Sequence, residues 1–255
     1  MSTLLEIKGL TKHFGGLAAV NQFDMEVHKG EILVLIGPNG AGKTTIFNLI
    51  TGVFTPTRGQ VIYDGTEITG KKPHKVAELG IGRTFQLNPL FGGFSVLQNV
   101  SASFHLHPRS SLFDIYFNTA KYRRNEAYIL EQSLEILRLV GLDKVKDESA
   151  KNLPHGYQKM LGVARALATR PKLLLLDEPL AGMNPSEIEF TLANIRRTQQ
   201  QGVTFLIVEH NMQVLELCDR VVVISFGQKI CEGLPGEVRE NQDVIRAYFG
   251  GGHVA

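Results

Sequence analysis

A glycine-rich segment between an apolar run and a helical pattern constrains this chain more than any other feature. The pattern GxxxxGK(S/T) is matched by Gly37-Pro38-Asn39-Gly40-Ala41-Gly42-Lys43-Thr44. The segment follows the wholly apolar run Ile32–Ile36, and the helix expected after it has Thr44 and Thr45 in its first turn. Because such an apolar run is typical of a strand buried on both faces, the order strand, loop and helix predicts an α/β fold.

The glycine-rich loop has the chemistry of a phosphate site. Successive backbone N–H groups in such a loop point into one concavity, and the N-terminus of the following helix adds partial positive charge. Lys43 is placed to reach the β- and γ-phosphates of a nucleotide, and the Thr44 hydroxyl to ligate Mg²⁺. The alternative is a glycine-rich turn that happens to contain a lysine. The flanking strand and helix favour the phosphate loop.

Two adjacent carboxylates end a second apolar run. Leu173 to Leu176 lead directly into Asp177 and Glu178, so both carboxylates are expected at the carboxyl end of a buried strand, where parallel sheets bind their ligands. Asp177 suits the Mg²⁺ shell, and Glu178 suits a general base acting on a water beside the γ-phosphate. A pair of solvated charges at a strand end is the alternative, and a neighbouring phosphate loop weakens it.

The remaining patterns predict strands towards both ends of the chain and helices in its middle. Strand-like runs occupy residues 4–9, 21–27, 172–177, 203–208 and 220–225. The run 122–140 has apolar residues three and four positions apart, as an amphipathic helix does, and further helices are expected at 210–217 and from Asn184-Pro185 onward. Strands that alternate with helices predict a largely parallel sheet.

The domain organisation follows from these patterns. We expect a single domain, 1–255, in which residues 1–85 and 153–255 form the α/β core with an N-terminal β region. Residues 86–152 are expected to form a helical subdomain inserted between the two parts of the core, because residues 122–140 have helical periodicity and residues 101–118 have no clean period.

Composition and charge argue against several classes of protein. The 255 residues contain 27 Lys and Arg against 25 Asp and Glu, and the resulting net charge of +2 is too small for a broad nucleic-acid-binding face. No apolar run approaches the roughly 18–20 residues that a membrane span needs. The first residues lack a basic stretch followed by an apolar core, so we expect a cytosolic protein. The isolated Cys218 and Cys231 indicate neither a zinc site nor a redox site.

Further motifs complete a pattern that resembles the ATPase subunits of ABC transporters over essentially the whole chain. Besides the phosphate loop and the strand ending in Asp177-Glu178, these are Thr84-Phe85-Gln86-Leu87, Leu153-Pro154-His155-Gly156-Tyr157-Gln158-Lys159, and His210 after a strand. The resemblance implies a P-loop NTPase ABC cassette, with a parallel-sheet core, an N-terminal antiparallel β region and a helical subdomain. It also implies ATP and Mg²⁺ as cofactors.

The same resemblance assigns roles to three residues. Gln86 would contact Mg²⁺ and the attacking water at the junction with a transmembrane partner, His210 would contact the γ-phosphate, and Phe14 would stack on adenine. Each residue also has an ordinary interpretation: Gln86 as a surface loop residue, His210 as a helix N-terminal histidine, and Phe14 as part of the core.

The segment that begins at Leu153 departs from the family pattern, which is usually LSGGQ. Pro154 replaces the serine whose hydroxyl faces the γ-phosphate bound by the opposite subunit, and Tyr157 replaces the glutamine; Leu153 and Gly156 are retained. The trans contact would then rely on backbone N–H groups around Gly156 and on the N-terminus of the helix that begins there.

Finer features resemble the ATPases of branched-chain amino acid importers, and the related urea and short-chain amide importers share them. They lie in the segments 14–21, 83–86, 181–185 and 243–250. This resemblance implies a homodimer, or a heterodimer with a paralogous ABC ATPase, bound to transmembrane permease subunits at the inner face of the membrane. A periplasmic or extracellular solute-binding protein would be an indirect partner, and no nucleic acid is expected. The alternatives are a soluble ABC ATPase serving translation or DNA repair, and a nucleotide-binding module that does not hydrolyse ATP.

Overall fold

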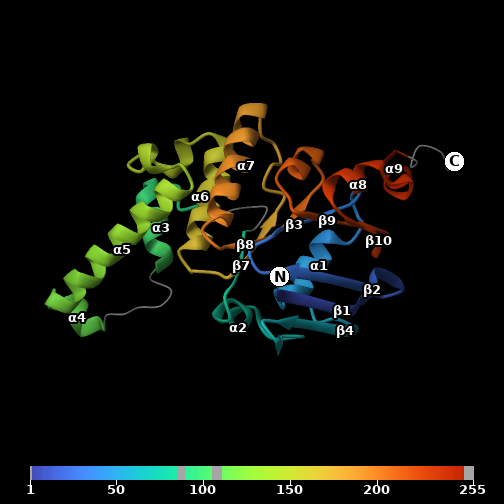
Figure 1. The fold of residues 1–255 in the computed structure, drawn as a ribbon. Coiled ribbons are helices and arrows are strands. Elements are labelled where there is room, and N and C mark those ends of the chain that lie inside the picture. The colour runs from blue at the N-terminus through green and yellow to red at the C-terminus, as the bar shows by residue number, and fades with distance from the viewer. Residues whose placement is uncertain (1, 85–89, 105–110, 250–255) are drawn as a thin grey trace. The chain divides into compact units, whose positions relative to one another are not determined.

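A computed structural model describes residues 2–84, 90–104 and 111–249, and the chain forms two compact units (Figure 1). The first comprises Met1–Gln86, Lys172–Ala181 and Gln199–Ala255, and the second comprises Leu87–Pro171 and Gly182–Thr198. The second unit therefore begins one residue after the start of the predicted insertion, but it extends beyond residue 152. The reason is that the helix following residue 154 packs against the helices of the insertion.

A six-stranded sheet forms the centre of the first unit, in the order β10-β9-β3-β8-β7-β6. Its strands are β3 (Ile32–Ile36), β6 (Ile81–Arg83), β7 (Leu173–Asp177), β8 (Thr204–Glu209), β9 (Arg220–Ser225) and β10 (Gln228–Gly233). All neighbours are parallel except β10, which pairs antiparallel with β9. Every residue of β3, β7 and β8 is buried. The predicted parallel-sheet core is confirmed.

A second sheet confirms the antiparallel region expected at the N-terminus. It has the order β2-β1-β4-β5, and its strands are β1 (Thr3–Phe14), β2 (Leu17–His28), β4 (Arg58–Tyr63) and β5 (Thr66–Glu67). Helix α1 (Lys43–Ile50) contributes Phe47 to one hydrophobic core together with Phe23 of β2 and Val208 of β8. This shared core fixes α1, and hence the loop before it, against both sheets of the unit (Figure 1).

The first unit also contains α2 (Pro73–Glu78), α8 (Pro235–Glu240), α9 (Gln242–Phe249) and a 3-10 helix, η3 (Met212–Glu216). The helix predicted at 210–217 is wrong in type and extent, since only η3 forms there. The physical reason is local: the Glu209 carboxylate accepts the N–H groups of His210 and Asn211, and the Asn211 side chain accepts that of Gln213. Asn211 therefore caps η3, so helical structure begins at Met212, and the two N–H groups before it bond to the Glu209 carboxylate instead.

The second unit is helical. Its elements are α3 (Val96–Phe104), α4 (Leu112–Tyr116), α5 (Ala120–Leu139), α6 (His155–Leu167), α7 (Pro185–Gln199) and two 3-10 turns, η1 (Asp143–Val145) and η2 (Ala150–Asn152). The predicted helix at 122–140 corresponds to α5, which begins earlier because Thr119 caps it. Helix α7 begins at Pro185, as predicted. Among the residues described, no helix combines the length and apolarity that a membrane crossing requires.

Candidate active site

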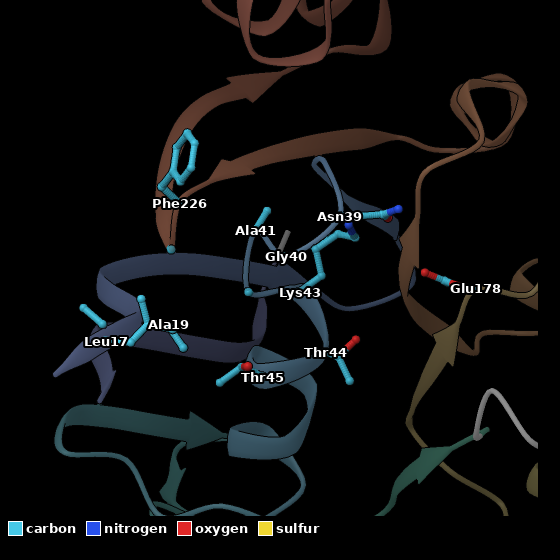
Figure 2. A pocket seen from close by; sticks show the side chains of 13 residues that line it. Leu17, Ala19, Asn39, Gly40, Ala41, Lys43, Thr44, Thr45, Glu178 and Phe226 are labelled. Carbon is cyan, nitrogen blue, oxygen red and sulfur yellow. The ribbon is translucent and has the colours of Figure 1, made fainter. Parts of the chain in front are cut away.

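A concave pocket opens where the loop between β3 and α1 meets the ends of neighbouring strands (Figure 2). Its lining is formed by Leu17, Ala18, Ala19, Asn39, Gly40, Ala41, Gly42, Lys43, Thr44, Thr45, Glu178, Phe226 and Gly227. The structure thus brings Glu178 and the predicted loop residues 39–45 to one cavity. Gly37 and Pro38 precede this stretch and form the base of the loop.

Two glycines of the loop are required by its geometry. Gly42 precedes α1 with a φ of 106°, in the left-handed region, and a Cβ there would lie 2.5 Å from the carbonyl oxygen of Ala19. A Cβ at Gly37 would lie 2.2 Å from the carbonyl oxygen of Ile224. Any other residue at these positions would force the backbone apart, so the glycines allow the loop to close tightly over the sheet.

Lys43 is held inside the loop. Its side chain is buried, and its Nζ donates to the carbonyl oxygens of Gly37 at 2.6 Å and Pro38 at 2.9 Å. Burial lowers the pKa of this ammonium, and the negative charges of three carboxylates oppose that effect, those of Glu178, Glu209 and Asp177. A phosphate chain in the pocket would give the ammonium anionic acceptors in place of neutral carbonyls.

Asp177 ends β7 as a buried carboxylate with a buried partner. It accepts a hydrogen bond of 2.9 Å from Nη2 of Arg83, at the end of β6, and the two side chains are 6% and 7% exposed. Arg83 also donates to Asn48 at 2.7 Å and to Thr51 at 3.2 Å on the α1 side. The predicted metal ligand therefore has a fixed position and a counter-charge. Sequence reasoning missed Arg83, because its partner is distant in the chain.

Glu178 lies on strained backbone beside His210. Its φ is +48°, in a region that costs a non-glycine residue roughly 1–2 kcal/mol, and its N–H donates to the carbonyl oxygen of Val208 at 2.9 Å. Its Oε1 lies 3.6 Å from Nδ1 of His210, and the imidazole is about half exposed. The structure therefore brings together the two residues expected to act on the attacking water and the γ-phosphate.

A fully buried carboxylate, that of Glu209, connects the turns that carry these two residues. One of its oxygens accepts the N–H of Leu180 at 2.7 Å, and the other accepts the N–H groups of His210 at 2.9 Å and Asn211 at 3.1 Å. The Leu180 turn follows Glu178, so one side chain fixes the backbone after β7 and after β8. The signal that we missed was a glutamate ending an otherwise apolar strand.

Two aromatic residues differ in their relation to the pocket. Phe14 packs edge-on against Phe54 with ring centroids 5.3 Å apart, and Lys12 Nζ lies 5.2 Å from its ring. Phe14 does not belong to the described lining of the pocket, so its adenine-stacking role stays a prediction. Phe226, on the turn between β9 and β10, does line the pocket and is 92% exposed (Figure 2). Sequence reasoning missed it.

Gly156 belongs to the second unit, at the start of α6. Its N–H donates to Oε1 of Glu187 at 2.9 Å, and a Cβ added to it would lie 2.9 Å from the Glu187 Cβ. Hydrogen bonds from the N–H groups of Gly156 and Asn184 lower the pKa of the Glu187 carboxyl. The amide expected to face a phosphate is therefore bonded within its own unit. Gln86 lies outside the described residues.

Comparison with known proteins decides the family. The sequence profile described as "ABC transporter" matches residues 20–181, which include the loop, Asp177 and Glu178. The chain belongs to the ABC transporter family. A second profile, described as "Branched-chain amino acid ATP-binding cassette transporter", matches residues 228–254. Membership makes this chain an ATP-binding cassette with ATPase activity.

Similar proteins match the chain over nearly its whole length. The high-affinity branched-chain amino acid transport ATP-binding protein BraF of Pseudomonas aeruginosa is 41% identical, over 97% of this chain and 98% of BraF. LivG of Escherichia coli, which carries the same description, is 38% identical over 97% and 98%. A crystal structure of the ADP conformation of an ABC transporter cassette superposes with a TM-score of 0.86, at 31% identity, over 98% of this chain and all of that one.

Proposed function

We propose that this chain is the ATP-hydrolysing subunit of an ABC importer that takes up branched-chain amino acids through transmembrane partner subunits. The observation that carries the ATPase half is the pocket in which the Lys43 loop and the Glu178 carboxylate face the same space. The substrate half rests on the descriptions of BraF and LivG and on the profile matched by residues 228–254.

The residues of the pocket fit the phosphate chain of ATP. Backbone N–H groups of residues 39–45 and the N-terminus of α1 offer donors and partial positive charge, and Lys43 adds a full charge. Thr44 and Asp177 would hold Mg²⁺, with Gln86 as a further ligand; oxygen donors of this kind suit that ion. When bound, Mg²⁺ would offset charge on the β- and γ-phosphate oxygens.

Glu178 supplies the base. Its carboxylate lines the pocket and can accept a proton from a water that attacks the γ-phosphorus. The bond between the γ-phosphorus and the oxygen that bridges the β- and γ-phosphates then breaks, and ADP and phosphate leave. His210 would donate to the γ-phosphate beside it, and the Glu209 bonds hold both turns still. Either Phe14 or Phe226 would meet the adenine ring.

Transport would require a second ATPase subunit, whose Gly156 segment completes the site in trans. The Gly156 N–H can reach a phosphate only after its hydrogen bond to the Glu187 carboxylate breaks. When the dimer closes, this N–H would therefore donate to a phosphate oxygen in place of the carboxylate. The partner subunit is a second copy or a paralogue, and the permease subunits hold the pair at the inner face of the membrane.

Reconstitution tests this proposal. The chain, combined in proteoliposomes with its permease subunits, their binding protein and, where one exists, its paralogous ATPase, should give ATP-dependent uptake of leucine, isoleucine or valine. The Lys43→Ala variant should give none, since its pocket lacks the phosphate-binding charge. A system that takes up urea or a short-chain amide with ATP, but does not take up branched-chain amino acids, would contradict the proposed substrate class. The assignment as an ATPase would remain intact.

A further inference from the structure

A cluster of exposed apolar side chains surrounds the short helix α4 of the second unit. This cluster, the α4 patch, consists of Leu112, Phe113, Ile115, Tyr116 and Phe117. Leu112 and Tyr116 are 86% and 83% exposed, and the Phe117 ring contacts those of Phe113 and Tyr116 at centroid distances of 4.4 and 5.1 Å. A contiguous apolar surface of this kind marks an interaction site rather than a core.

The patch stands away from the body of its unit. None of the residues of α4 is buried, and the first buried residue of α5 is Ile129. The stretch of α5 from Ala120 to that point spans about 14 Å at 1.5 Å per residue, and Figure 1 shows α4 at the far end of this helix. The apolar side chains of α4 therefore remain largely outside the packed core of the second unit.

Local hydrogen bonds fix the orientation of the patch. Ser111 and Asp114 form a capping box at the start of α4, and the other Asp114 oxygen accepts from the Thr119 hydroxyl at 3.0 Å. Lys121 lies 3.3 Å from the same carboxylate, and these contacts hold the pKa of Asp114 well below its usual range. The patch is thus presented by an ordered turn, whose single acid is already bonded.

Basic residues follow the patch in the chain, on the first turns of α5. Lys121, Arg123 and Arg124 are exposed, and within the described residues neither arginine makes an ion pair. The acids on this stretch are Asp114, bonded as above, and the half-buried Glu126. Aromatic and leucine side chains beside exposed arginines are the composition of segments that lie in the interface of an anionic membrane.

We propose that the α4 patch inserts into the headgroup region of an anionic lipid membrane, with Arg123 and Arg124 contacting lipid phosphates. The proposal does not depend on which solute is transported or on the catalytic residues. Long arginine side chains on the first turns of α5 can reach the headgroups while the aromatic rings of the α4 patch lie deeper, so the two adjoining segments together suit both parts of the interface.

Cosedimentation of the full chain with lipid vesicles tests the proposal. Wild type should bind vesicles of equal parts phosphatidylglycerol and phosphatidylcholine, and bind pure phosphatidylcholine about tenfold more weakly. Two double variants should each bind the anionic vesicles at least about tenfold more weakly than wild type: Phe113→Ser/Tyr116→Ser and Arg123→Glu/Arg124→Glu. The control variant is Lys71→Glu/Lys72→Glu, which changes the net charge by the same amount as Arg123→Glu/Arg124→Glu but at exposed residues of the first unit. This control should bind the vesicles like wild type.

Three results would overturn the proposal. The first is no binding of wild type to the anionic vesicles. The second is unchanged binding by either patch variant with its fold intact, as judged by circular dichroism and by the ATPase rate in solution. The third is a wild type that dimerises without lipid in sedimentation velocity and becomes monomeric in Phe113→Ser/Tyr116→Ser, because the patch would then bind a second copy of the chain.

Discussion

Replacing the buried Glu209 by glutamine should destabilise the first unit and slow hydrolysis, although the side chain keeps its size. The carboxylate accepts three N–H groups, one on Oε1 and two on Oε2. In the better orientation the amide oxygen keeps the His210 and Asn211 bonds, and the amide NH₂ faces the N–H of Leu180. One buried N–H then lacks an acceptor, which costs about 1–3 kcal/mol.

Urea denaturation followed by circular dichroism measures this cost. Glu209→Gln should lower the urea midpoint by an amount that corresponds to about 1–3 kcal/mol of unfolding free energy, with an unchanged m-value. The variant should also have a lower ATPase rate, because the turns that carry Glu178 and His210 shift. Glu67→Gln makes the same chemical change on the exposed strand β5 and should leave both quantities unchanged. A Glu209→Gln midpoint equal to that of wild type would refute the role assigned to these three hydrogen bonds.

Four further substitutions test other parts of the site. Either Phe14 or Phe226 is expected to stack on adenine. Replacing the stacking residue by Ala should weaken ATP binding by about 1–3 kcal/mol in calorimetry and leave tripolyphosphate binding unchanged. If both Ala variants bind ATP as tightly as wild type, neither residue stacks on the base. Gly156→Ala should lower the urea midpoint, because the added Cβ lies 2.9 Å from that of Glu187; an unchanged midpoint contradicts this. The pKa of Glu187 is depressed from 4.5 in the folded chain, so its stabilisation is present above that pH and is lost as the pH falls through the folded value. The difference in free energy of unfolding between wild type and Glu187→Gln should therefore become smaller below about pH 4.5. A difference that does not change with pH would contradict the hydrogen bonds assigned to the Glu187 carboxylate.

The parts of the site that could be predicted from the sequence are those that local chemistry determines. An apolar run followed by a glycine-rich turn and a helix can be recognised over a few residues, and β3, the loop and α1 form as the pattern predicts. Asp177 and Glu178 could be placed for the same reason, since they end an apolar run. The helical insertion was predicted in outline from the helical pattern at 122–140, and the antiparallel β region from the resemblance to ABC cassettes.

What could not be predicted depends on contacts between distant segments. Arg83 meets Asp177 only because β6 and β7 are neighbours in the sheet, and Phe226 lines the pocket only because the β9–β10 turn approaches β2. The short helix α4 has too few residues for a helical period to be visible. The extent of the helix predicted at 210–217 also depended on such a contact. The N–H groups of His210 and Asn211 bond to the Glu209 carboxylate, and Asn211 caps η3, so helical structure begins only at Met212.

Glu178 is proposed to act as the base for ATP hydrolysis in a site built on the Lys43 loop. The direct measurement is steady-state ATP hydrolysis by the purified chain and its Glu178→Gln variant, with ATP affinity determined on the same samples. The variant should bind ATP as wild type does, because the loop is unchanged, and should hydrolyse it about 10²–10⁴-fold more slowly. Hydrolysis by Glu178→Gln at the wild-type rate would contradict the account.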